Sequence, residues 1–156
     1  KELRANGEEI RHFGFGQSPF PIHRSIIEAL QEHAHNNHYL PVAGLDALRE
    51  QIAVFLGRFQ NIKSQKESIF IGPGSKELLY QSILIFEGVF LIPKGSWVSY
   101  IPQIQSKGGK YHIIDTDFKN DFKITAQDLE VFFENKNAKK QYILILNSPS
   151  SSKKSF

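Results

Sequence analysis

The chain reads NNHYLPVAGLDALRE at residues 36–50, IFIGPGSKE at residues 69–77 and FLIPKGSWVSY at residues 90–100. In the second and third stretches, a short apolar run rich in β-forming residues ends in a glycine and proline turn, and a helical pattern follows. This alternation continues to residue 147 and is typical of βαβ units with a largely parallel sheet. The sequence therefore predicts an α/β fold.

Four runs are predicted as strands, at residues 69–72 (IFIG), 89–93 (VFLIP), 111–115 (YHIID) and 141–147 (QYILILN). The last run is apolar almost throughout, as expected for a parallel strand covered on both faces by helices. Helices are predicted between the strands, at about residues 75–86, 97–107 and 126–135. Thr125 and Asp128 have the spacing of a capping box at the start of the third of these.

Two further helices are predicted before the first strand. Pro21 precedes one that runs toward Asn36, with isoleucine and leucine side chains at helical spacing. The other follows the PVAG turn and carries one apolar stripe, formed by Leu45, Leu48, Ile52, Phe55, Leu56 and Phe59.

Composition excludes several classes of function. The 156 residues carry a net charge of +3 with scattered lysines, which argues against a nucleic-acid partner. The absence of cysteine excludes disulfides, thiol catalysis and thiolate metal sites. No apolar run approaches the ~20 residues that cross a bilayer, so no membrane partner is expected. A soluble cytoplasmic protein fits these properties best.

Gly74, Ser75 and Lys76 stand where a predicted strand gives way to a helix. Free backbone N–H groups and the positive end of the helix dipole meet at such a point, which makes it suitable for a phosphate. The alternative is an ordinary tight turn with Ser75 as the N-cap. These residues alone favour neither interpretation.

Trp97 and Asn147 are the other candidate ligand-binding residues, because both follow predicted strands at the edge where parallel sheets bind ligands. One interpretation of Trp97 is that it offers a flat face to an aromatic ring, and the other is that it is a core residue packed between helix and sheet. One interpretation of Asn147 is that it donates to a ligand oxygen, and the other is that it caps the turn after its strand. His33 and His35 are two residues apart and point in different directions, so no metal site is predicted.

Taken in order, these segments resemble the class I and II, fold type I aminotransferases over nearly the whole chain. Residues 39–53 (YLPVAGLDALREQIA) resemble the family's Y-x-P-x-x-G-x-x-x-L-R-x-x-I/L-A stretch, and residues 73–79 (PGSKELL) resemble its phosphate-binding turn. Residues 92–100 (IPKGSWVSY) with the later KGG resemble the P-x-x-W/Y-x-x-Y element. Residues 147–149 (NSP) resemble the start of N-x-P-x-N-P-T-G.

The resemblance implies a fold, an activity and a cofactor. The fold is the three-layer α/β/α large domain of aspartate aminotransferase type, with an N-terminal arm and helix at residues 1–40 and an incomplete large domain at residues 41–156. The activity is transfer of an amino group between an amino acid and a 2-oxo acid with pyridoxal 5'-phosphate. Gly74, Ser75 and Lys76 would hold the cofactor phosphate, Trp97 would stack on the ring, and Asn147 would bond the ring hydroxyl oxygen.

Two further roles follow from the same resemblance. Tyr39 would reach the phosphate of a partner's cofactor across a homodimer interface, and Gly16 would lie near the substrate carboxylate.

The sequence also departs from the family. After NSP it continues with serines and lysines to Phe156, whereas the family has N-P-T-G. The Schiff-base lysine, the acid that protonates the ring nitrogen and the arginine that binds the substrate carboxylate come later in the family. We therefore expect an N-terminal fragment that is inactive by itself, with residues 69–72 left as an unpaired edge strand that needs further chain or a partner.

Three alternatives stay open on sequence alone. One is another enzyme of the same fold, such as a decarboxylase, synthase or β-lyase. The second is a non-catalytic degenerate relative that acts in ligand binding or dimerisation, which the altered NSPSSSKKS segment favours. The third is an unrelated phosphate-binding α/β module.

Overall fold

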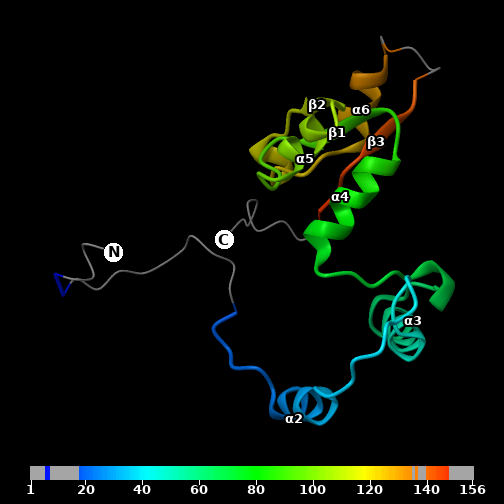
Figure 1. The fold of residues 1–156 in the computed structure, drawn as a ribbon. Helices are drawn as coiled ribbons and strands as arrows, with labels where there is room; N and C mark the ends of the chain where they lie inside the picture. The colour runs from blue at the N-terminus through cyan, green and yellow to red at the C-terminus, as the bar shows by residue number, and fades with distance from the viewer. Residues whose placement is uncertain (1–5, 8–17, 135, 137–139, 148–156) are drawn as a thin grey trace. The chain divides into compact units, whose positions relative to one another are not determined.

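The computed structural model describes residues 6–7, 18–134, 136 and 140–147. The chain divides into two compact units, residues 1–39 and residues 40–156. Figure 1 labels the helices and strands along the chain. In the first unit, helix α2 (Arg24–His33) begins after His23, whose ring accepts the N–H of Ser25. The predicted helix is confirmed, and its apolar side chains Ile26, Ile27 and Leu30 are exposed within the described residues, as is Ile22 just before the helix.

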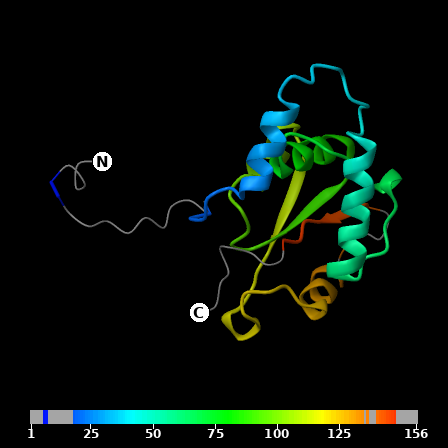
Figure 2. The ribbon, with the colours of Figure 1, turned by 90° about the horizontal axis from the view of Figure 1, so that it is seen from below.

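The second unit is built on a parallel sheet of three strands in the order β2-β1-β3. The strands are β1 (Val89–Pro93), β2 (Lys110–Ile114) and β3 (Tyr142–Leu144). Figure 2 shows them side by side, with β1 between the other two. The register pairs Phe90 with Tyr111 on one side and with Ile143 on the other.

The structure corrects the prediction of a strand at residues 69–72. A 3-10 turn, η1 (Lys66–Ser68), leads into this segment, which joins no ladder among the described residues. Its backbone instead bonds a loop, because the N–H of Ile71 donates to the carbonyl of Ala43 at 3.0 Å. A run with strand composition becomes a strand only when a neighbour accepts its backbone bonds.

One face of the sheet is covered by helices α4 (Ser75–Ile85) and α5 (Tyr100–Ser106). The core between them and the sheet is formed by Ile83, Phe90, Ile92, Tyr100, Ile104 and Ile145. Phe90 and Ile92 are two residues apart and therefore point to this same face. The structure shortens the predicted helix at 97–107, because Trp97 and Val98 lie in a turn before Tyr100.

Helix α6 (Ala126–Phe133) covers the opposite face. Its Phe132 ring contacts His112 of β2 at 4.7 Å and Tyr142 of β3 at 5.7 Å between centroids. In the ladder, His112 pairs with Leu91, whose side chain points away from the Phe90 face. The predicted three-layer arrangement of helices, sheet and helix is thus present, and the capping box of Thr125 and Asp128 is confirmed.

Helix α3 (Asp46–Gln60) precedes η1, and a second 3-10 turn, η2 (Phe118–Asn120), precedes α6. The helix predicted after the PVAG turn is confirmed as α3. Of its apolar stripe, Leu45, Leu48, Phe55 and Phe59 are exposed in the described part of the chain. Among the described residues, no helix has both the length and the apolar character required to span a membrane.

Candidate functional site

The N-terminus of α4 is an open helix end. Gly74 is the N-cap, with φ of 104° and ψ of 153°, and it has no side chain to occupy the cap position. Ser75 is thus the first helical residue and not the N-cap. Leu78 N–H reaches back to the carbonyl of Gly74 at 3.3 Å. The N–H groups of Ser75, Lys76 and Glu77 precede that first helical bond, so helix geometry leaves them available to an anion.

Space in front of this helix end is also open. A Cβ atom added to Gly74 would meet no other group within 4 Å. Gly74 has a positive φ, a backbone conformation that glycine adopts at little cost. The turn therefore exposes the helix end and keeps side-chain bulk away from it.

Trp97 and Lys76 lie together beside this helix end. The Nζ atom of Lys76 is 5.5 Å from the centre of the Trp97 ring, a cation–π distance. The rings of Trp97 and Tyr100 also make a T-shaped contact, at 5.6 Å between centroids and an interplanar angle of 78°. Tyr100 is buried and Trp97 is 39% exposed. One side of the indole is thus anchored on the core while part of it stays accessible.

Asn147 is exposed and lies three residues beyond the end of β3. Just before it, Ile145 N–H donates to the carbonyl of Leu91 in β1 at 3.0 Å, which continues the contact of the chain with β1 one residue beyond the end of β3. Parallel strands end at one edge of a sheet, so Asn147 and the turn that carries Trp97 belong to the same edge.

The remaining predicted site residues belong to the first unit or lie outside the described residues. Tyr39 is fully exposed and belongs to the first unit, whereas α4 and Trp97 belong to the second. Gly16 and the altered segment at residues 148–156 lie outside the described residues. Of the predicted residues, the structure brings Lys76 into contact with Trp97, next to Gly74 and Ser75.

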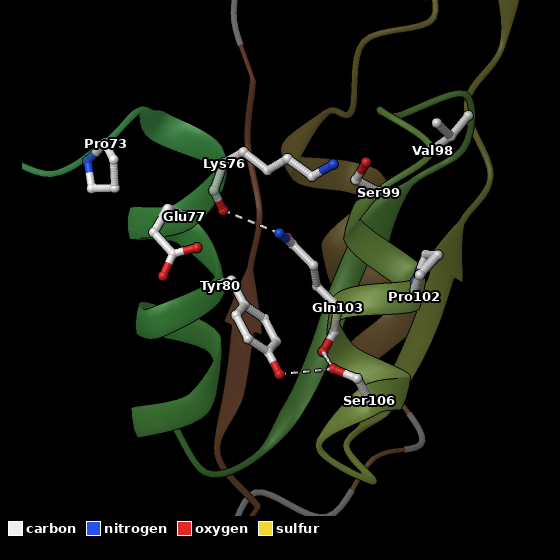
Figure 3. Close-up of a pocket in the computed structure, with 9 residues that line it drawn as sticks. All are labelled: Pro73, Lys76, Glu77, Tyr80, Val98, Ser99, Pro102, Gln103 and Ser106. Carbon is white, nitrogen blue, oxygen red and sulfur yellow. Dashed lines mark hydrogen bonds between the residues drawn. The ribbon is translucent and has the colours of Figure 1, made fainter.

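A groove of about 650 Å³ lies between α4 and α5, next to this site (Figure 3). Lys76 lines it, and Figure 3 shows its side chain extending from α4 toward the turn at Val98 and Ser99. Two bonds cross between the helices at the groove: Gln103 Nε2 donates to the carbonyl of Lys76 at 3.1 Å, and Ser106 Oγ donates to Tyr80 Oη at 3.3 Å. These bonds fix the position of α4 relative to α5.

An ion pair ties the carboxyl ends of β1 and β2. Lys94 Nζ lies 2.8 Å from Asp115 Oδ1, and Thr116 Oγ1 donates to the carbonyl of Lys94 at 3.3 Å. The hydrogen bond to the Asp115 carboxylate raises the pKa of Lys94. Asp115 compensates the charge of Lys94, whereas Lys76 makes no ion pair within the described part of the chain and lies beside the α4 end.

Arg49 is a residue of this region that the sequence interpretation missed. It is the buried charged residue among those that the structure describes, and its guanidinium bonds the chain that leads to Gly74. A signal was present: Arg49 lies four residues after Leu45 and three before Ile52, which puts it on the apolar stripe of α3. An arginine on such a stripe needs partners inside the protein.

Comparison with known proteins identifies the family of this chain. The family model described as aminotransferase class I and II matches residues 8–153. The chain is 34% identical over 156 residues to the aspartate aminotransferase of Bacillus subtilis and 29% identical over 157 residues to the asparagine–oxo-acid transaminase of Streptococcus mutans. Each alignment covers 97% of this chain and 39% of the relative.

Solved structures of aminotransferases superpose on this chain. The aspartate aminotransferase from Rhizobium meliloti superposes with a TM-score of 0.81 at 22% identity, covering 96% of this chain and 38% of that one. The aromatic aminotransferase from Pyrococcus horikoshii gives 0.77 at 26% identity, covering 96% and 41%. The fold is therefore that of the aspartate aminotransferase large domain, in part. By both sequence and fold, the chain belongs to the class I and II aminotransferases.

Proposed function

We propose that this chain supplies the phosphate-binding and ring-binding part of a pyridoxal 5'-phosphate-dependent aminotransferase. The complete site would transfer an amino group between an amino acid and a 2-oxo acid. The relatives are named as aspartate, asparagine and aromatic aminotransferases. The proposal therefore covers the amino-group transfer that these names share and specifies no particular amino acid. The observation that carries it is the open N-terminus of α4 beside a half-exposed indole and a lysine.

The residues fit a phosphorylated aromatic ring. The N–H groups of Ser75 and Lys76 would donate to phosphate oxygens, with the helix dipole and the Lys76 ammonium adding attraction. Trp97 would stack on the ring, because part of its indole is accessible while Tyr100 fixes its orientation. Asn147, at the same sheet edge, would donate its amide N–H to the ring oxygen.

The cofactor would supply an electron sink for the carbanion formed when the amino acid loses its α-proton. The residues of this chain would bind and orient that group and would exchange no proton with the substrate. Gly16, near the substrate carboxylate by resemblance, would complete this chain's part of the site.

The proposal includes a homodimer, in which Tyr39 would contact the phosphate of the partner's cofactor. Tyr39 is fully exposed in the first unit, as a residue that contacts a second subunit would be in an isolated chain. The expected species is a particle of twice 17.8 kDa in sedimentation velocity, and a monomer that stays monomeric with ligand would contradict this part.

The experiment is calorimetric titration of the protein with pyridoxamine 5'-phosphate and with pyridoxamine. Neither ligand carries an aldehyde, so surface lysines cannot trap it covalently. The protein should prefer the phosphorylated ligand, and Trp97→Ala should bind it about tenfold more weakly because the ring loses its stacking surface.

The matched control is Phe118→Ala, which removes another exposed aromatic ring, one that packs on Phe122 in the η2 region. It should bind both ligands as the unmodified protein does. Equal affinity of the unmodified protein for the two ligands, or an unchanged affinity in Trp97→Ala, would contradict the proposal.

A further inference from the structure

Arg49 connects α3 to the segment that leads into the α4 turn. Its side chain is 11% exposed, and it makes four hydrogen bonds. Nη1 donates to Asp46 Oδ1 at 2.9 Å, and Nη2 donates to the carbonyl of Lys66 at 2.7 Å. Nε donates to the carbonyls of Ile69 at 2.8 Å and of Lys66 at 3.1 Å. A buried guanidinium with these partners holds two carbonyls in a fixed position relative to the helix.

The segment that Arg49 holds has few other anchors. Residues 69–72 join no ladder in the described part of the chain, so sheet pairing does not fix them there. A second attachment lies two residues further on, where Ile71 N–H donates to the carbonyl of Ala43. Lys66 Nζ adds a third, with Glu50 Oε1 at 3.0 Å and Asp46 Oδ2 at 3.4 Å. All three attachments join this segment to α3 or to the loop before it.

The chain continues from Ile69 to the helix end in five residues. Gly74 N–H donates to the carbonyl of Gly72 at 2.7 Å, so the turn is tight and transmits the position of residues 69–72 to the start of α4. A shift of Ile69 would therefore move or loosen the N–H groups of Ser75 and Lys76. Preorganised donors lose affinity when their support is released.

We propose that Arg49 is a positioning residue for the phosphate-binding end of α4. It does not touch the ligand, and it acts by fixing the Lys66 and Ile69 carbonyls. This inference rests on the proposed function, because it assigns Arg49 a role in binding the phosphate of that cofactor. Lysine cannot replace it, since one ammonium cannot reproduce the planar fork that reaches two carbonyls and a carboxylate together.

The test compares Arg49→Lys with Arg58→Lys. Arg58 is an exposed arginine on the same helix that lies over the Phe59 ring at 5.2 Å, so the second variant makes the same chemical change away from the clamp. Trp97 is the sole tryptophan, and its fluorescence reports binding of pyridoxamine 5'-phosphate and of pyridoxamine.

Arg49→Lys should weaken binding of the phosphorylated ligand about tenfold and change that of pyridoxamine less than about twofold. Without any ligand, it should also raise hydrogen exchange of the Ile69, Ile71 and Leu78 amides while those of β1 stay protected. Arg58→Lys should change neither the ligand affinities nor the hydrogen exchange of these amides. If Arg49→Lys does not fold, Asp46→Asn should show the same selective loss to a smaller extent, because it keeps the guanidinium and weakens the Nη1 bond together with the 3.4 Å ion pair of Asp46 with Lys66.

Two results separate this inference from the proposed function. If the unmodified protein does not distinguish the two ligands, the proposed function fails. If it prefers the phosphorylated ligand and Arg49→Lys keeps that preference while losing thermal stability, the proposed function stands and Arg49 is a structural residue only.

Discussion

Gly44 is the residue at which the loop before α3 meets the segment before α4. Its φ is +99°, and a Cβ added to it would lie 2.5 Å from Cβ and Cγ1 of Ile71. The adjacent backbone bond joins Ala43 to Ile71. The glycine of the PVAG turn is therefore required by both its backbone conformation and the close approach of a side chain.

Replacing Gly44 by alanine should lower the free energy of unfolding by about 2–4 kcal/mol, the sum of left-handed backbone strain and overpacking against Ile71. Denaturant unfolding measures this free energy. Gly57→Ala is the matched control, because Gly57 lies inside α3 with only the Ile62 carbonyl near its Cβ position, at 3.9 Å. That variant should gain up to about 1 kcal/mol from helix propensity. If both variants lower stability equally, the contact at Ile71 is not what selects glycine.

Residue types alone indicated only part of the candidate site. Gly74, Ser75, Lys76 and Trp97 became candidates because a glycine turn before a helical pattern and a sole tryptophan have distinctive local sequences. Arg49 was not recognised, because its partners are backbone carbonyls 17 and 20 residues away. The contact of Lys76 with Trp97 likewise depends on how α4 and the turn after β1 are packed, which no local pattern encodes.

At the scale of elements, the start of α6 is defined by a reciprocal cap. Thr125 N–H donates to Asp128 Oδ2 at 2.7 Å, and Asp128 N–H donates to Thr125 Oγ1 at 3.3 Å. The first of these bonds, together with the bond from the Thr125 hydroxyl, lowers the pKa of Asp128. The cap therefore stabilises α6 most when Asp128 is ionised.

The pH dependence of stability follows from this shift. Since the pKa of Asp128 is lower in the folded than in the unfolded protein, its contribution is complete above the unfolded value of about 4 and is lost as the pH falls through the folded value. Asp128→Ala should therefore be less stable than the unmodified protein at pH 7, and the difference should shrink below about pH 4. Denaturant unfolding of both proteins at several pH values measures this difference in stability.

Glu130→Ala controls for loss of a carboxylate on α6, since Glu130 makes no side-chain bond or ion pair among the described residues. Its difference from the unmodified protein should vary less with pH. A difference for Asp128→Ala that stays constant from pH 7 to the acid range would contradict the cap as its origin.

Element boundaries were predicted best where local signals exist. β1 has the predicted bounds, and α3, α4 and α6 begin within about one residue of the predicted position, because caps and turns mark them locally. The strand predicted at residues 69–72 was wrong for a nonlocal reason. Its composition suits a sheet, but the described residues provide no neighbouring strand, and the backbone bonds Ala43 instead.

At the scale of the whole molecule, the second unit places the carboxyl ends of its three strands at one edge. The turn with Trp97 follows β1, Asn147 follows β3, and α4 is fixed beside α5 by the bonds of Gln103 and Ser106. The chain spans 39% of the length of the curated relatives it matches, and this part carries the helix end and the indole. In the proposed function, these two features form one binding site for a phosphorylated ring.

The most direct test is a ¹⁵N–¹H correlation spectrum of the protein titrated with pyridoxamine 5'-phosphate and, separately, with pyridoxamine. The phosphorylated ligand should shift the amides of Ser75, Lys76 and Glu77 together with the Trp97 indole. Pyridoxamine should shift the indole and leave the three amides nearly unchanged. A shared site at α4 and Trp97 is ruled out if the phosphorylated ligand leaves the α4 amides unmoved, or if its largest shifts lie away from both α4 and Trp97.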